Sequence, residues 1–347
     1  MEATPQQLKV LPPPLLAWYD ENRRVLPWRE QVSPYRTWVS EIMLQQTRVT
    51  AVLPYFDRFM AALPTVAALA DAPEQQFMSL WQGLGYYSRA RNLQKAAQVI
   101  MTRHGGVFPD TYEGLTALPG VGDYTAGAIA SIAFGQPVPA VDGNVLRLAA
   151  RLTGCDDNVL EPKTRARFRR WMAEVIPSDR PGAFNQALMD LGAMVCLPNG
   201  APLCEQCPAR TFCTACEKGL QRQLPVREKK TARRVEQRTV FLLRQEDAIA
   251  LRQRPATGLL AGLWEFPNVP GALTERQAAE QLAEWGIIPH RWGKSFTDKH
   301  VFTHITWEMT VFTITAQGAG PPEWVWCPDE EREKYPMPTA FGKLEKE

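Results

Sequence analysis

The sequence predicts a multidomain protein with an all-α first part and a smaller α+β second part. Three observations support this prediction. The chain has 347 residues, which is enough for two hydrophobic cores. Apolar residues recur at helical spacing from Leu15 to about Lys218. Beyond residue 237, alternating and β-branched segments replace that spacing.

The composition is that of a soluble globular protein, with 45% hydrophobic and 22% charged residues. We expect no secretory signal, because no basic segment followed by an apolar one opens the chain, and no window is apolar enough to span a membrane. These features favour a cytoplasmic, bacterial-type protein. The net charge is only +2, but 163–171 and 222–234 are locally basic. Such stripes suit a polyanion, although a solvated helix face is the commoner cause.

The first part, residues 1–219, is predicted to contain several short helices with tight connections. Trp38, Ile42 and Val49 follow one apolar stripe, and breaks such as "ALPTV", "GVFPDTY" and "FGQPVP" separate the segments. Residues 220–234 are polar, basic and weakly patterned, which is typical of a linker.

The second part, residues 235–347, contains three further patterns. The stretch "RTVFLLRQEDAIALRQR" alternates around an acidic turn and predicts a β-hairpin. The stretch "ALTERQAAEQLAEWGI" predicts an amphipathic helix, and "HVFTHITWEMTVFTITAQ" predicts another strand pair. Strands together with a helix make this an α+β domain.

Five of the seven cysteines lie between residues 195 and 216. In a reducing compartment, clustered cysteines more often bind metal than form disulfides. Cys196, Cys204, Cys207 and Cys213 have the spacing C-x7-C-x2-C-x5-C, which is compatible with an iron–sulfur cluster. With Cys216 in place of Cys196, two CxxC pairs would make a zinc site. The spacing alone leaves both alternatives open.

The stretch "ALPGVGDYTAGAIASIAFG" predicts two helices joined by a glycine-rich hairpin. Gly120 and Gly122 permit a tight turn and a close approach of backbone to a ligand. The helix that starts at about Asp123 presents free N–H groups and the positive end of its dipole, which together bind phosphate.

Two acidic residues suit the cleavage of a glycosidic bond, which needs an acid for the leaving group and a negative charge near the sugar. Glu41 shares a helix side with Trp38 and Gln45, and burial there would raise its pKa. Asp142 precedes Gly143 and a predicted helix. Capping of that helix is the alternative role for Asp142.

Together, these motifs resemble those of the helix–hairpin–helix DNA glycosylases of the endonuclease III superfamily. The resemblance implies a six-helix barrel at about 29–134 and a cluster domain formed by 1–28 and 135–219. It also implies one [4Fe-4S] cluster held by Cys196, Cys204, Cys207 and Cys213, with Cys216 as a bystander. The first gap between these cysteines is seven residues here, whereas six is usual in the family.

Within the superfamily, "SEIMLQQT", "GLGYYSRARNL", "LPGVGDYTAGAI" and "VDGNVLR" are similar to the adenine DNA glycosylase (MutY) family. This similarity implies removal of adenine opposite 8-oxoguanine, and more weakly opposite guanine, as the first step of base excision repair. Glu41 would be the general acid and Asp142 the stabiliser of the sugar cation, with Tyr124 and Asn144 as close supports. Tyr124 stands where lyase members carry a lysine, which implies a monofunctional glycosylase.

The same similarity implies a set of DNA contacts. Gln46 and Tyr86 would insert into the duplex where the base has left, and Trp28 and Arg29 would line the adenine pocket. Leu84, Gly120 and Gly122 are expected to be further DNA contacts.

In the second part, "GLLAGLWEFPNV" resembles the entry strand of a Nudix hydrolase such as MutT. The following helix lacks the paired glutamates of a working Nudix box, so we expect a domain that binds without hydrolysing. Phe302, Thr303 and His304 match the short Phe-Ser-His loop that reads 8-oxoguanine in the family. A plain β-strand is the alternative interpretation of this stretch.

We therefore expect a monomer that acts on double-stranded DNA containing adenine opposite 8-oxoguanine, joins the nucleoid during repair, and has no membrane partner. Three alternatives were weighed: a bifunctional glycosylase/AP lyase, a non-catalytic lesion-binding protein, and a nucleotide hydrolase centred on the second domain. Tyr124 argues against the first, the pair Glu41 and Asp142 against the second, and the broken Nudix box against the third.

Overall fold

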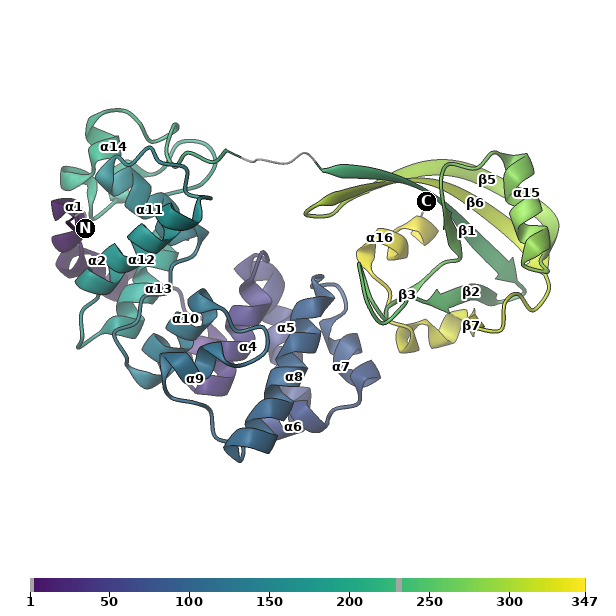
Figure 1. Cartoon of the computed structure of the whole chain (residues 1–347), viewed down its shortest axis with the longest axis horizontal. Coiled ribbons are helices and arrows are strands. Elements are labelled where there is room, and N and C mark those ends of the chain that lie inside the picture. Colours follow the sequence, from purple (N-terminus) through teal and green to yellow (C-terminus); the bar gives the residue numbers. More distant parts are fainter. Residues whose placement is uncertain (1–2, 229–232, 347) are drawn as a thin grey trace. The chain divides into compact units, whose positions relative to one another are not determined.

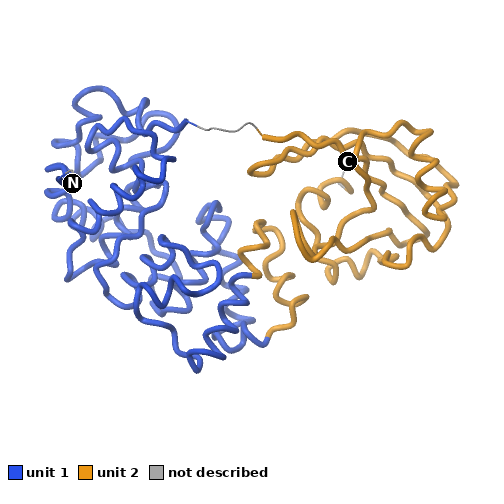
Figure 2. Tube along the Cα trace, viewed as in Figure 1, with its two compact units in different colours: residues 1–71, 92–229 blue, residues 72–91, 230–347 orange. Residues whose placement is uncertain are grey.

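A computed structural model describes residues 3–228 and 233–346. The chain divides into two compact units, coloured in Figure 2. Unit 1 comprises residues 1–71 and 92–229, and unit 2 comprises residues 72–91 and 230–347. Among the described residues, no helix combines the length and apolar character needed to cross a membrane.

Unit 1 is built from helices joined by short loops, as the sequence predicts (Figure 1). Their bounds are α1 (Gln6–Lys9), α2 (Pro12–Asn22), α3 (Pro27–Glu30), α4 (Pro34–Leu44), α5 (Val49–Ala62), α6 (Val66–Asp71), α8 (Tyr87–His104), α9 (Tyr112–Thr116), α10 (Asp123–Phe134), α11 (Gly143–Thr153), α12 (Pro162–Val175), α13 (Pro181–Met194), η1 (Cys204–Gln206), η2 (Arg210–Phe212) and α14 (Thr214–Glu217). The first residues of α8 fall within residues 72–91 of unit 2.

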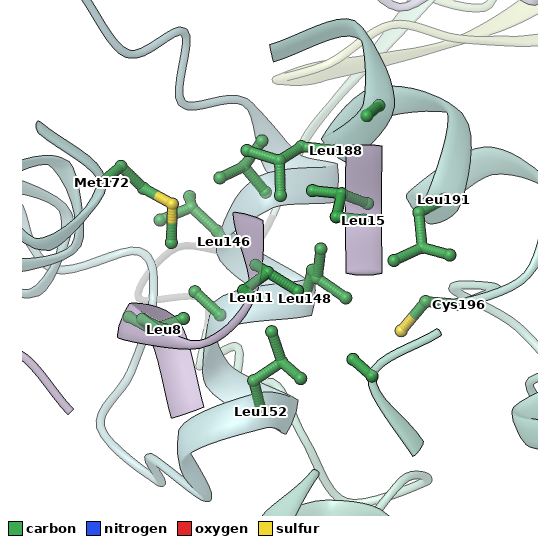
Figure 3. Packing of buried hydrophobic residues seen from close by; sticks show 14 of the residues in the cluster. Leu8, Leu11, Leu15, Leu146, Leu148, Leu152, Met172, Leu188, Leu191 and Cys196 are labelled. Carbon is green, nitrogen blue, oxygen red and sulfur yellow. The ribbon is translucent and has the colours of Figure 1, made fainter. Parts of the chain in front are cut away.

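One hydrophobic core of unit 1 joins the start of the chain to the segment beyond residue 140. Figure 3 shows leucines of the N-terminal helices packed with leucines of α11 and α13 and with Met172 of α12. Cys196 lies at this same core with 8% of its surface exposed. The cysteine-rich segment is therefore attached to the body of the unit through a buried residue.

The hairpin between α9 and α10 has the geometry that its glycines suggest. Gly120 has a φ of 75°, and a Cβ at this position would lie 2.6 Å from Cβ of Asn92. Both the left-handed conformation and the space therefore require glycine. Gly122 is the N-cap of α10, and no side chain caps this helix end.

Unit 2 contains a mixed β-sheet with strand order β3-β2-β1-β6-β5, while β4 pairs with β1 and β7 with β2. The strands are β1 (Arg234–Gln245), β2 (Ala248–Gln253), β3 (Trp264–Glu265), β4 (Asn268–Pro270), β5 (Ile288–Val301), β6 (Ile305–Gln317) and β7 (Trp324–Pro328). The pair β1 and β6 is parallel, and the other pairs are antiparallel.

Alternate residues of β1 face two different cores, because side chains along a strand point to opposite faces. Val240 and Leu242 join one core with Phe341 of α16 (Thr339–Gly342), whereas Phe241 and Leu243 join the other. The second core is covered by α15 (Glu275–Glu284), which begins with a capping box of Thr274 and Gln277. Unit 2 also contains α7 (Glu74–Trp81), η3 (Asp329–Lys334) and η4 (Leu344–Lys346).

The division differs from the predicted boundaries in two places. The predicted linker at 220–234 is shorter than expected, because Arg151 donates to the carbonyl of Leu224 and Val159 donates to that of Val226. Residues 220–228 thus belong to unit 1, and Arg234 already begins β1. The rest of the predicted linker, 229–232, lies outside the described residues.

Residues 72–91 were predicted to lie within the helical barrel but are grouped with unit 2. Gln75 donates to the carbonyl of Lys334 in η3, and Arg91 donates to the carbonyl of Ala261. These contacts join segments that lie far apart in the sequence, so no local pattern reports them.

Candidate active site

A pocket of ≈ 520 Å³ in unit 1 gathers most of the predicted catalytic residues. It is lined by residues of α3, α4, α10, α11 and α13. The predicted residues at this pocket are Trp28, Arg29, Glu41, Tyr124, Asp142 and Asn144.

Glu41 lies on the buried side of α4 and is only 6% exposed. Its Oε2 accepts a hydrogen bond of 2.6 Å from the hydroxyl of Tyr124. Burial raises the pKa of Glu41 to about 7, although the Tyr124 hydrogen bond and the charge of Arg29 oppose this rise. A carboxyl group with this pKa carries a proton in a large fraction of molecules near neutral pH, so it can act as an acid.

Asp142 is the N-cap of α11, so the alternative role in helix capping is confirmed. Its Oδ1 accepts hydrogen bonds of 2.9 Å from the backbone N–H groups of Asn144 and Val145, and its Oδ2 accepts one of 2.7 Å from the Asn144 side chain. Burial raises the pKa of Asp142, and these three hydrogen bonds oppose the rise. Capping fixes the carboxylate at the pocket wall, where it can face a positive charge.

Tyr124 and Asn144 link the two carboxyl groups to their surroundings. The pKa of Tyr124 is raised well above its ordinary value by burial and by the nearby charges of Glu41 and Asp142. The hydroxyl is therefore a permanent donor to Glu41. Asn144 accepts a hydrogen bond from Arg147, which also donates to the carbonyl of Cys196. The active site and the cysteine-rich segment are thus joined by one chain of hydrogen bonds.

A buried ion-pair cluster holds Arg24 and Arg29, two of the residues that line the pocket. Asp190 of α13 is fully buried and pairs with Arg29 at 2.7 Å and with Arg24 at 2.5 Å. Burial raises the pKa of Asp190, but the hydrogen bonds and charges of the two arginines outweigh it and leave the pKa below its ordinary value. The Arg29 guanidinium is held in place, and Trp28 beside it packs its ring edge on Phe56 at 5.0 Å.

Three further polar or polarisable residues at this pocket, two on α13 and one in the loop between α2 and α3, were not predicted from the sequence. Gln186 and Met189 line it, and so does Arg24, which Asp190 holds. Gln186, Met189 and Asp190 recur at three- and four-residue spacing on one side of α13. This periodicity was the available signal, but nothing in the sequence indicates which side of α13 faces the pocket.

The two residues predicted to insert into DNA have unusual backbones. Gln46, in the loop between α4 and α5, is exposed and has a φ of 59°, while Tyr86, before α8, is 43% exposed and has a φ of 49°. Strained non-glycine residues of this kind cluster at functional sites. Leu84 is buried at 7% exposure, so direct insertion of its side chain does not fit this conformation. Gly120 and Gly122 lie apart from the pocket, at the hairpin before α10.

The five clustered cysteines line one cavity, together with Arg151 and Arg210. All are free thiols, and Arg151 donates to Sγ of Cys196 at 3.2 Å. Burial raises the pKa of Cys207 to about 12. The structure does not separate Cys216 from the four predicted ligands, since its side chain lines the same cavity.

A zinc site and an iron–sulfur cluster are the two alternatives that the spacing left open for these thiols. Four thiolates around one zinc ion would lie about 3.8 Å apart, given a Zn–S distance of ~2.3 Å. Within residues 3–228 and 233–346, no group of three or more Cys, His, Asp or Glu side chains is arranged to hold a metal ion.

In unit 2, the predicted lesion-reading residues form the turn of the β5–β6 hairpin. The alternative interpretation as a continuous strand is wrong, because β5 ends at Val301 and β6 begins at Ile305. Phe302 packs its ring against Trp307 at 4.9 Å, and its N–H donates to the carbonyl of Ile305. Thr303 and His304 are exposed at the tip.

Comparisons with known proteins agree with this arrangement. The model of the HhH-GPD superfamily of base excision DNA repair proteins matches residues 39–174, and the model of the NUDIX domain matches residues 239–347. The solved structure of a thermostable thymine-DNA glycosylase aligns with a TM-score of 0.55 at 27% identity, over 62% of this chain and 100% of that one. Endonuclease III in a non-covalent DNA complex has the same fold, with a TM-score of 0.51 at 24% identity over 60% of this chain and 95% of that one.

Fold and pocket together define the class: a helix–hairpin–helix DNA glycosylase that carries a Nudix-type domain. The chain is 36% identical to the human adenine DNA glycosylase, over 95% of this chain and 72% of that protein. It is 35% identical to the rat adenine DNA glycosylase, over 95% of this chain and 76% of that protein. The chain belongs to the adenine DNA glycosylase family, whose enzymes remove adenine in base excision repair.

Proposed function

We propose that this enzyme hydrolyses the N-glycosidic bond of an adenine paired with 8-oxoguanine in duplex DNA, without cutting the strand. The observation that carries the proposal is the convergence of a buried, protonatable Glu41 and a capped Asp142 on one pocket. The pocket is the space into which a flipped adenine would fit, since enzymes that act on a base take it out of the stack.

Glu41 acts as the general acid in this scheme. A protonated carboxyl group donates to the departing adenine, which leaves as a neutral base. The hydroxyl of Tyr124 stabilises the carboxylate that remains, because it donates to Oε2 at 2.6 Å. Asp142 then faces the cationic sugar, and the hydrogen bonds that hold both of its oxygens keep the carboxylate oriented.

The absence of strand cleavage follows from the lining of the pocket. Strand cleavage by a glycosylase needs an amine that attacks the sugar carbon and forms a Schiff base. Among the described residues that line the pocket there is no lysine, and Tyr124 contributes a hydroxyl that is already bonded to Glu41. Water is therefore the nucleophile in the proposed reaction.

A [4Fe-4S] cluster is proposed for the cysteine cavity, with Cys196, Cys204, Cys207 and Cys213 as ligands. Four free thiols around one cavity, with a buried guanidinium at Cys196, fit the negative charge of such a group. When bound, the cluster supplies covalent ties between segments that otherwise have little regular structure. Base release itself is proton transfer and hydrolysis by residues of α4, α10 and α11.

Recognition of 8-oxoguanine is assigned to the hairpin turn of unit 2. The removed adenine is a normal base, so the signal of damage has to come from the opposite strand. 8-Oxoguanine differs from guanine in its C8 oxygen and in the hydrogen on N7, and a hydroxyl can donate to the one or accept from the other. Thr303 presents such a hydroxyl at an exposed tip, and Phe302 anchors that tip on Trp307.

The test is a single-turnover reaction on a duplex with one adenine opposite 8-oxoguanine, quenched with and without alkali. We expect free adenine in both cases and a broken strand only after alkali. Strand cleavage without alkali would show a lyase, and absence of free adenine would leave only a lesion-binding protein.

A further inference from the structure

A second hollow of unit 1, which shares only Arg151 with the lining of the cysteine cavity, has four arginines in its walls. Its volume is ≈ 580 Å³, and no carboxylate lines it. We call it the arginine hollow. The lining residues are Arg147, Arg151, Pro198, Asn199, Gly200, Arg222, Leu224, Pro225 and Arg227.

Two of these arginines form a rigid, buried inner wall. Arg147 and Arg151 lie one helical turn apart on α11, with 4% and 3% of their surfaces exposed. Arg147 donates to the carbonyls of Cys196 and Gly192, and Arg151 donates to those of Leu224 and Leu197. These carbonyl partners are neutral, and among the described residues neither arginine forms an ion pair with a carboxylate. Arg151 also donates to Sγ of Cys196, a proposed cluster ligand, so within the part of the chain that the structure describes Arg147 is the inner arginine without a charged partner.

The other two arginines lie on the outer rim. Arg222 and Arg227 are exposed, and in the described part of the chain neither forms an ion pair with a carboxylate. The segment that carries them is nevertheless fixed to unit 1. Val226 accepts a hydrogen bond of 3.0 Å from Val159, and Glu228 exchanges two hydrogen bonds with the side chain of Asn158.

The third wall is the seven-residue gap between Cys196 and Cys204. The N–H groups of Leu197 and Leu203 both donate to the carbonyl of Val195, so the loop is closed at its base. Pro198, Asn199 and Gly200 project from it and are exposed. The gap, "LPNGAPL", contains no charged side chain. The positive charge that lines the hollow therefore comes from its four arginines and not from this loop.

The arginine hollow lies beside the catalytic carboxylate. A Cβ placed on Gly143 would lie 3.4 Å from Nη2 of Arg227, and Gly143 directly follows Asp142. A sugar held at Asp142 carries phosphodiester groups on both sides. A guanidinium next to this point can bind phosphate with two parallel hydrogen bonds.

We propose that the arginine hollow binds a phosphodiester of the DNA strand that carries the target adenine, with Arg227 and Arg222 as its direct contacts. This inference rests on the proposed function, which places the sugar of that adenine at Asp142. Arg147 supplies a fixed positive charge behind these two contacts, while Arg151 is shared with the cysteine cavity, and the Pro198–Gly200 wall adds no carboxylate that would repel a phosphate.

The test uses the full chain and a duplex in which an abasic tetrahydrofuran replaces the target nucleotide opposite 8-oxoguanine, so that nothing is hydrolysed. Binding is measured at several salt concentrations for the wild type, Arg227→Ala, Arg222→Ala and the double variant. Each lost phosphate contact is expected to reduce the slope of log Kd against log salt by about 1. Arg276→Ala is the matched control, because Arg276 is an exposed arginine on α15 that pairs with Glu280.

A second arm identifies the phosphate. A neutral methylphosphonate is placed on either side of the tetrahydrofuran, one position at a time. At one of the two positions, the methylphosphonate should weaken binding to the wild-type protein by the same factor as Arg227→Ala weakens binding to unmodified DNA. The methylphosphonate and Arg227→Ala combined should then weaken binding no more than either change alone. Additive losses at both positions, or salt slopes equal to that of the wild type, would overturn the proposal.

Free anions are the competing source of the same chemistry. If calorimetry shows that the wild type binds pyrophosphate, that the double variant does not, and that the DNA salt slopes are unchanged, the hollow is an anion site unrelated to DNA and the proposal is wrong. Failure of the proposed function is distinguishable, since it would appear as absent adenine release by the wild type while these binding slopes remain measurable.

Discussion

In the proposed reaction, Glu41 is the residue on which catalysis depends most directly. We expect Glu41→Gln to bind the duplex but to release adenine ~10²–10⁴-fold more slowly, because the amide keeps the shape and has no suitably acidic proton. A single-turnover assay with radiolabelled DNA measures this change. Glu280→Gln removes an exposed carboxylate on α15 and serves as the control. A Glu41→Gln rate within a few-fold of wild type would exclude Glu41 as the acid.

The same residue makes stability depend on pH. The folded-state pKa of Glu41 is raised to about 7 from an ordinary 4.5, so the unfolded state loses this proton at a lower pH than the folded state does. The contribution of Glu41 to stability is therefore complete below pH ~4.5 and is lost as pH rises through ~7, which amounts to roughly 3 kcal/mol.

The glutamine of the Glu41→Gln variant does not titrate. The variant should therefore have a higher free energy of unfolding than the wild type at pH 8 but not at pH 4.5. Urea unfolding at both pH values measures the difference. An equal effect at the two pH values would mean that the pKa of Glu41 is not raised.

A separate prediction at the residue scale concerns which cysteines are ligands of the proposed cluster. Cys196→Ser should lose the yellow-brown colour and the iron of the purified protein, because Cys196 is buried at the core and its sulfur accepts from Arg151. Cys216→Ser should keep both. Iron analysis and the violet absorption band check the pair of variants. The reverse result would move the fourth ligand to Cys216, which lines the same cavity.

At the scale of the element, the β5–β6 hairpin positions Thr303. Thr303→Val keeps the shape of the tip and removes the hydroxyl. We therefore expect this substitution to weaken binding to duplexes with adenine opposite 8-oxoguanine more than binding to duplexes with adenine opposite guanine. The loss of one neutral hydrogen bond is worth roughly 1 kcal/mol, or about fivefold in Kd. Thr303→Ser is the matched control, since it restores the hydroxyl without the methyl. Equal losses opposite both bases would rule out Thr303 as the reader.

Elements with a local signal could be predicted from the sequence. The β1–β2 hairpin turns at Glu246 and Asp247 as the acidic turn predicts, and α15 follows its apolar period and its capping box. The hairpin before α10 follows from Gly120, whose left-handed backbone only glycine adopts easily. Each of these features is decided within about ten residues.

Elements decided by distant contacts could not be predicted. The parallel pairing of β1 with β6 joins segments some 70 residues apart, and the burial pattern of β5 shows no clear apolar face. The place of Gln186 at the pocket depends on how α13 packs on α10 and α11. The anchoring of residues 220–228 depends on Arg151 and Val159, which lie far back in the chain.

At the scale of the whole molecule, the proposed function divides catalysis and lesion recognition between the two units. Glu41, Tyr124 and Asp142 all belong to unit 1, and the Phe302–His304 turn belongs to unit 2. A fragment that ends at Glu228 keeps the Leu224 carbonyl that Arg151 needs, whereas a cut at Arg222 would remove it. Residues 1–228 are therefore the fragment in which to look for catalysis without lesion recognition, although residues 72–91 then lose their contacts with the rest of unit 2.

The measurement that tests this division most directly is the single-turnover rate of adenine release opposite 8-oxoguanine and opposite guanine, for the full chain and for residues 1–228. The full chain should strongly prefer 8-oxoguanine. The fragment should remain a slow adenine glycosylase that has lost most of this preference. A fragment that still strongly prefers 8-oxoguanine would show that residues 1–228 read the lesion, around Gln46 or Tyr86, and would contradict the assignment of recognition to the Phe302–His304 turn.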